Sequence, residues 1–291
     1  MRQSIIFLFF AGLSICGSIA PEPLLAKSIE VEETNLPRVL IIGDSTYSSH
    51  TRDLAKVLKG KAEVVYAFWH PHEMVDTKTT LQLIDRHLGR IDRNGTPVDE
   101  SKWPHWDLIH FNCGLGDLIH RAPGLSSLRV MPIHVGGIRN TSEKHYKENL
   151  EAIVQTLKQK APNATLVWAS TTPIRASVTQ VFEVGSEIKY NRIAAEVMEH
   201  HQVPINDMYF FVKHLIDMDK PAGFGFDPFH FDKKPIHMPI VRIIEKTFAL
   251  PAVAETEEEK WSREQSKLAG EVSGEVSGEV SGEEDSKTKN D

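Results

Sequence analysis

One serine of this chain stands where a nucleophile is expected. The apolar run 38–42 leads directly into Gly43-Asp44-Ser45, and a helical pattern follows. A serine at the end of a buried strand, with a helix starting behind it, can attack an acyl carbon while its own N–H donates to the resulting oxyanion. The plainer interpretation is that Asp44 and Ser45 only cap the helix.

A serine nucleophile needs a base, and a suitable pair occurs near the end of the chain. Asp227-Pro228-Phe229-His230 precedes the last predicted helix. A histidine there can accept the serine proton while the carboxylate holds its tautomer. Because the chain has 14 histidines, an Asp-x-x-His pattern alone says little. Together with Ser45 on the first strand, however, it predicts the catalytic set Ser45, His230 and Asp227.

Two other groups of reactive side chains are expected to be structural. Cys113 has no histidine placed to activate it, so we expect a buried thiol rather than a nucleophile. His70 and His72 stand two residues apart without a convincing third and fourth ligand. No metal site and no cofactor are therefore predicted.

The elements that must position these residues alternate between strand-like and helix-like segments. Short apolar runs rich in β-branched residues predict strands at 38–42, 62–68, 108–112, 165–169 and 203–206. Helical spacing predicts helices behind Ser142 to about 157, at 190–197 and at 236–248, whereas 90–106 and 121–141 are loop-like. The pattern predicts a three-layer α/β fold with a mainly parallel, five-stranded sheet, in which loops at the carboxyl ends of the strands build the site.

These motifs in this order resemble the SGNH or GDSL hydrolase family. The family has a flavodoxin-like fold, and its members are mostly esterases and lipases, including many carbohydrate O-acetylesterases. Gly43-Asp44-Ser45 matches its first block and Asp227 with His230 its last, and the resemblance extends over 38–248. It implies ester hydrolysis in which Ser45 attacks, His230 acts as base and then acid, and Asp227 orients His230.

The chain departs from the family where the oxyanion is stabilised. The third block, Gly-x-Asn-Asp, corresponds to Gly114-Leu115-Gly116-Asp117, so Gly116 stands where an asparagine side chain would donate. The glycine of the second block has no counterpart in 68–72. One oxyanion donor contributes about a hundred- to a thousandfold in rate, so a substitute is needed.

Several residues are candidates for that role. The resemblance implies oxyanion or substrate contacts from Asp44, Asn112, Gly114 and Gly116. Side-chain substitutes for the missing asparagine are Asn112, His70 and His72. A different alignment takes 137–140, which ends in Asn140, as a displaced third block.

Composition and charge limit the partners. At 291 residues, 41% of them apolar and 25% charged, the chain is long enough for one sizeable core. We assign this core to residues 27–250, and we expect 251–291, with its Glu-Val-Ser-Gly repeats, to be a disordered acidic tail. Residues 252–291 hold 12 acidic and 5 basic residues, which leaves 28 of each elsewhere. A neutral body is not expected to bind nucleic acid.

The first 26 residues predict export. Arg2, an apolar stretch over 5–13 and small residues at 18 and 20 are typical of a signal peptide. The stretch is too short to span a bilayer, and no later segment is long and apolar enough. We expect a secreted or periplasmic protein without an integral membrane segment, with a lipid anchor at Cys16 as the alternative.

Two functions are compatible with these features. The first is an exported serine ester hydrolase that acts on a small-molecule or carbohydrate ester, for which removal of O-acyl groups is the hypothesis. The second is a binding protein of the same fold that holds a glycan or a partner and has lost catalysis with its oxyanion side chain.

Overall fold

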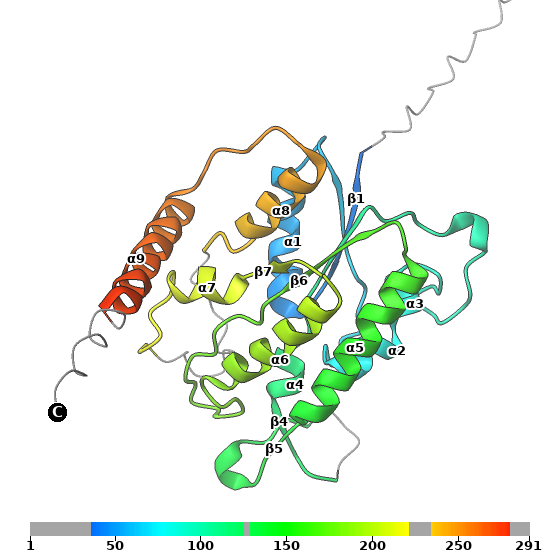
Figure 1. Cartoon of the computed structure of the whole chain (residues 1–291). Coiled ribbons are helices and arrows are strands. Elements are labelled where there is room, and N and C mark those ends of the chain that lie inside the picture. The colour runs from blue at the N-terminus through cyan, green and yellow to red at the C-terminus, as the bar shows by residue number, and fades with distance from the viewer. Residues whose placement is uncertain (1–35, 125–128, 221–233, 280–291) are drawn as a thin grey trace, which may run out of the picture. The chain divides into compact units, whose positions relative to one another are not determined.

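Five parallel strands form the centre of the structure (Figure 1). They are β1 (Arg38–Ile42), β2 (Glu63–Tyr66), β3 (Leu108–Phe111), β6 (Thr165–Ala169) and β7 (Ile205–Asn206). Their order in the sheet is β2-β1-β3-β6-β7, and every neighbouring pair is parallel. This computed structural model, which describes residues 36–124, 129–220 and 234–279, confirms the predicted five-stranded α/β fold.

Helices cover both faces of this sheet. One face carries α1 (Ser45–Val57), α7 (Met208–Lys213) and α8 (Met238–Phe248). The other carries α2 (Thr77–Gln82), α3 (Ile84–His87), α5 (Glu143–Lys160) and α6 (Ser186–His200). Val39 and Ile41 pack on the first face and Leu40 and Ile42 on the second, all of them at most 1% exposed. Burial on both sides is why these strands read as continuous apolar runs.

The helix behind Ser142 begins where the sequence predicts. The Ser142 side chain accepts a hydrogen bond from the His145 N–H at 3.3 Å and caps α5. The buried positions of α5 are those that recur at helical spacing, namely Tyr146, Leu150, Ile153, Val154 and Leu157. The helix therefore owes its stability to this apolar stripe against the sheet.

Short elements occur within segments for which the sequence predicts loops or no defined element. They are α4 (Leu115–Leu118), a two-stranded antiparallel sheet of β4 (His120–Arg121) and β5 (Ile138–Arg139), and 3₁₀ helices over Glu100–Lys102 and Ile133–Val135. Each of these elements is too short to show a periodic pattern of apolar residues in the sequence. The small sheet follows β3 and α4, and it brings Asn140 next to the loop after β3.

The folded body continues into the region predicted to be a tail. Helix α9 (Glu257–Glu279) lies within 251–291. Its residue Glu259 accepts two hydrogen bonds from the Arg242 guanidinium of α8, at 2.7 and 2.9 Å. Residues 280–291 lie outside the described residues, and disorder there stays a prediction.

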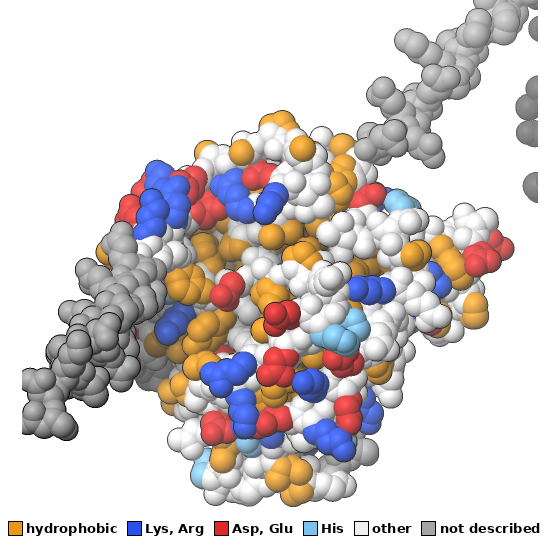
Figure 2. All heavy atoms as spheres, viewed as in Figure 1, with side chains coloured by type: hydrophobic (Ala, Val, Ile, Leu, Met, Phe, Trp, Pro, Cys, Tyr) orange, Lys and Arg blue, Asp and Glu red, His pale blue; other side chains and the backbone are white. Residues whose placement is uncertain are grey.

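The predicted signal peptide, residues 1–26, also lies outside the described residues. Within the described part of the chain, no helix has the length and apolar character needed to cross a membrane. On the face drawn in Figure 2, acidic and basic side chains are interspersed, which fits the nearly neutral body.

Candidate active site

Ser45 lies directly beyond the carboxyl end of β1, as the first residue of α1. Its side chain is exposed, whereas Asp44 and Thr46 beside it are buried. The carboxylate of Asp44 accepts a hydrogen bond from the Thr46 N–H at 2.9 Å and thereby caps α1. Among the described residues, the Ser45 hydroxyl has no hydrogen-bond partner. Asp44 therefore supplies the cap, and the Ser45 hydroxyl is available for chemistry.

The sheet order places Ser45 beside a crevice. Strand β1 lies between β2 and β3, and the chain leaves β1 towards one face of the sheet but leaves β3 towards the other. In open α/β sheets, ligands bind outside the carboxyl ends of the strands at such a reversal. Ile42 pairs with Phe111. Ser45 and Gly114 each lie three residues beyond this last pair, past the carboxyl ends of β1 and β3.

Two backbone donors at this edge have no acceptor. Within the residues that the structure describes, neither the Ser45 N–H nor the Gly114 N–H donates a hydrogen bond. Neighbouring strands run about 4.8 Å apart, so donors from adjacent strand ends can converge on one oxygen. This is the arrangement that stabilises a developing oxyanion.

Gly114 is a glycine because another loop passes close to it. A Cβ atom at this position would lie 2.0 Å from the Thr171 hydroxyl, which belongs to the loop after β6. Thr171 is not among the site residues predicted from the motifs. Its position two residues beyond a predicted strand, at the same edge of the sheet as Ser45, is the signal that points to it.

The amide of Asn112 is directed elsewhere. Asn112 is buried, and its Nδ2 donates to the Ala169 carbonyl at 2.8 Å. Ala169 belongs to β6, which lies on the side of β3 away from β1. The side chain thus joins the ends of β3 and β6, and a contact of Asn112 with the oxyanion stays a prediction.

Gly116 has no room for the side chain that the family pattern demands. A Cβ atom there would lie 2.3 Å from the carbonyl oxygen of Val75, in the loop after β2. The close approach of this loop to α4 explains why glycine replaces asparagine. Gly116 therefore offers the site only its backbone.

Asn140 is the last residue of the displaced third block, and its side chain is also fully used in hydrogen bonds within the fold. Its Nδ2 donates to the Gly116 carbonyl at 2.9 Å and to the Asp76 carboxylate at 2.8 Å, while its Oδ1 accepts from Arg121. An amide nitrogen carries two hydrogens, so both are used. Asn140 holds the loops after β2 and β3 together.

A buried carboxyl reinforces the same pair of loops. Asp117, fully buried in α4, accepts hydrogen bonds from the Thr77 N–H at 2.9 Å and from the Thr77 hydroxyl at 2.6 Å. Burial raises the pKa of Asp117 to about 7; the Thr77 hydroxyl opposes this rise, and the nearby charge of Asp76 adds to it. This aspartate titrates near neutral pH.

The turn that carries Ser45 is braced from β2. The Tyr66 hydroxyl donates to the Gly43 carbonyl at 2.7 Å and lies 3.0 Å from the Asp44 carbonyl. Burial raises the pKa of Tyr66, so its hydroxyl keeps the proton that it donates. The backbone before Ser45 is thereby fixed.

The remaining reactive residues take structural roles. Cys113 is fully buried, its Sγ lies 3.3 Å from the Thr80 hydroxyl, and burial raises the pKa of the thiol. The expectation of a buried thiol is confirmed. The ring of His70 stacks on His72 at 5.5 Å, and its Nε2 donates to the Arg93 carbonyl at 3.1 Å. His70 thus anchors its loop.

Asp227 and His230 lie outside the described residues. In the chain they fall between α7 and α8, on the C-terminal side of the last strand. Their approach to Ser45 stays a prediction.

The fold resembles solved structures whose names match the resemblance predicted from the motifs. A lipase/acylhydrolase from Enterococcus faecalis is 14% identical with a TM-score of 0.49, over 76% of this chain and 100% of the other. A GDSL-like lipase from Bacteroides thetaiotaomicron is 14% identical with a TM-score of 0.44, over 72% and 88%. An acetyl xylan esterase is 17% identical with a TM-score of 0.40, over 58% and 76%. The chain matches no protein-family model and no curated protein sequence.

Proposed function

We propose that this protein is a serine ester hydrolase with Ser45 as its nucleophile. The observation that carries the proposal is the exposed Ser45 hydroxyl at the carboxyl end of β1, beside the reversal in strand order, with the capping role taken by Asp44. His230 accepts the Ser45 proton during attack and returns it to the leaving alcohol. Asp227 holds the tautomer of His230.

The oxyanion hole is built from backbone rather than from an asparagine side chain. We assign it to the N–H groups of Ser45 and Gly114, which have no acceptor among the described residues. Asp44 supports these two donors by capping the start of α1. Gly116 supports them because its lack of a side chain allows the loop after β2 to pack closely against α4. Preorganised backbone donors stabilise a tetrahedral intermediate without moving during the reaction.

The substrate class follows from the position of the site. If the enzyme is exported, a nucleophile exposed at the surface can reach O-acyl groups on large extracellular carbohydrates. The acetyl xylan esterase among the similar structures has a substrate of this kind. No cofactor takes part in the reaction.

The competing function is that of a binding protein that has lost catalysis. It is favoured by one observation: the Asn112 amide is directed to β6, and position 116 admits no side chain. It does not account for the Ser45 hydroxyl being left out of the helix cap.

Hydrolysis of an aryl acetate by the purified full chain separates the two functions. We expect turnover by the wild type, and a loss of at least about a thousandfold in kcat for Ser45→Ala and for His230→Ala. Ser48→Ala is the matched control, since Ser48 is an exposed serine of the same helix. It should hydrolyse the ester as the wild type does.

A wild type that hydrolyses neither the aryl acetate nor acetylated glycans favours the binding protein. Turnover that survives Ser45→Ala removes Ser45 as the nucleophile. Preference for acetylated xylan over the aryl acetate supports the carbohydrate substrate.

A further inference from the structure

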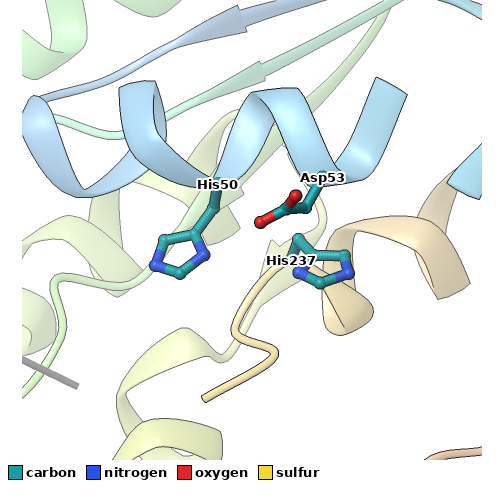
Figure 3. A group of neighbouring side chains, drawn as sticks. All are labelled: His50, Asp53 and His237. Carbon is teal, nitrogen blue, oxygen red and sulfur yellow. The ribbon is translucent and has the colours of Figure 1, made fainter. Parts of the chain in front are cut away.

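Two histidines and an aspartate converge on the side of the molecule where α1 packs against α8. His50 and Asp53 project from α1, and His237 lies directly before α8 (Figure 3). One ligand atom from each, an imidazole nitrogen or a carboxylate oxygen, can be chosen so that all three lie within 4.8 Å of one another. His50 and Asp53 stand three residues apart on one helix, which places them on the same face.

Hydrogen bonding within the group does not explain this convergence. The rings of His50 and His237 are nearly parallel, with centroids 6.4 Å apart, and the Asp53 carboxylate lies between them in Figure 3. Among the described residues, neither imidazole forms a hydrogen bond or ion pair with Asp53, whose partner is Lys56 at 2.9 Å. The Nδ1 atom of His237 is buried and has no partner within the same described part. A buried polar atom without a partner requires an explanation, and a bound ion is one that also accounts for the three converging side chains.

The donor set is that of a zinc ion. Zinc binds imidazole nitrogen and carboxylate oxygen at about 2.0–2.2 Å in a tetrahedron, which sets neighbouring ligand atoms about 3.4 Å apart. The three ligand atoms, within 4.8 Å of one another, would have to move closer by side-chain rotation to reach that value. Sites with three protein ligands keep a fourth position for water.

We propose that His50, Asp53 and His237 bind one zinc ion that joins α1 to α8. Neither the sequence motifs nor the proposed ester hydrolysis requires this ion. It would connect the helix that begins at Ser45 with the start of the last helix of the core. Because its ligands come from α1 and from the residue directly before α8, the bound ion should stabilise the contact between these two helices.

Zinc titration of the full chain, without a histidine tag and stripped with a chelator, tests the proposal. Calorimetry should show one equivalent bound at about micromolar affinity or tighter, and zinc should raise the melting temperature. His50→Gln and His237→Gln should each weaken binding at least about tenfold. Asp53→Asn, which changes a surface carboxylate and disturbs the fold least, should do the same.

The matched control is a second group of candidate ligands, Glu151, His200 and His201, on α5 and at the end of α6. His201→Gln should leave the zinc affinity unchanged. The proposal is overturned if the wild type binds no zinc, if His50→Gln and His237→Gln bind it as the wild type does, or if binding is lost in His201→Gln instead. Because binding is measured directly, a failure of ester hydrolysis has no bearing on the result.

Discussion

Asp44 caps helix α1, and this leaves the Ser45 hydroxyl without a capping role. The sequence alone does not show which of the two residues is the cap, because both residue types cap helices well. The structure gives the hydrogen bond to Asp44 and leaves the Ser45 side chain exposed. Tyr66 then fixes the backbone before Ser45 from the neighbouring strand. Reactivity at this position depends on neighbours that hold the turn while leaving the hydroxyl uncommitted.

Asp117 makes the stability of the fold depend on pH. Its pKa is about 7 in the folded chain, mainly because it is buried, whereas an unfolded aspartate has a pKa near 3.8. Between these values Asp117 is protonated in the folded state and ionised in the unfolded state, so its contribution to the free energy of unfolding falls as pH rises towards 7 and then levels off. One full proton corresponds to a slope of about 1.4 kcal/mol per pH unit.

Denaturant unfolding of the wild type and Asp117→Asn between about pH 5 and pH 8 measures this slope. The asparagine keeps the shape, with its oxygen accepting from the Thr77 N–H and its nitrogen facing the Thr77 hydroxyl. We expect the stability of the wild type relative to the variant to fall as pH rises over this range, because the other titrating groups are common to both proteins. Equal slopes for both proteins would show that Asp117 is ionised throughout.

The large elements could be predicted from sequence and the small ones could not. Strands β1 and β6 have the predicted bounds because burial on both faces makes them unbroken apolar runs. Three short elements show no hydrophobic periodicity in the sequence, namely α4, β4 and β5. Tertiary contacts determine their positions, for example the hydrogen bond from Asn140 to Gly116. Because these contacts decide the surroundings of Ser45, the motifs select a candidate nucleophile but not its candidate oxyanion donors.

Packing between α4 and the loop after β2 should reject an asparagine at position 116. Its Cβ would lie 2.3 Å from the Val75 carbonyl, and backbone cannot rotate away as a side chain can. We expect Gly116→Asn to lower the free energy of unfolding by about 1–3 kcal/mol and to leave kcat no higher than in the wild type. Thermal unfolding and ester hydrolysis measure the two effects. A stable variant with higher kcat would mean that the family's asparagine can be restored here.

The molecule as a whole joins residues that are far apart in the chain. His50 and Asp53 share a helix face, but His237 comes from the other end of the core, so local spacing predicts only two of the three proposed zinc ligands. The ion pair of Arg242 with Glu259 likewise joins α8 to a segment that composition assigns to a tail. Amino-acid composition indicates whether a segment is polar enough to remain disordered, but it does not reveal a specific contact such as that of Arg242 with Glu259.

Arg242→Met should release α9 from the body. The guanidinium also donates to Glu245 and to the Val253 carbonyl, so its removal frees several contacts at once. We expect faster amide hydrogen exchange over 257–268 and a loss of roughly 1 kcal/mol in global stability, because the pair is partly exposed. Lys260→Gln, which removes an exposed ion pair within α9, is the control and should exchange as the wild type does. Unchanged exchange in Arg242→Met would mean that other contacts dock α9.

The central claim, that Ser45 is an activated nucleophile, is tested most directly by covalent labelling with a fluorophosphonate followed by peptide mass spectrometry. The reagent forms a stable adduct only with a serine that a neighbouring base deprotonates. The account predicts one adduct per chain on the peptide containing Ser45, and none in Ser45→Ala or His230→Ala. An unlabelled wild type, or an adduct on another serine, would contradict it.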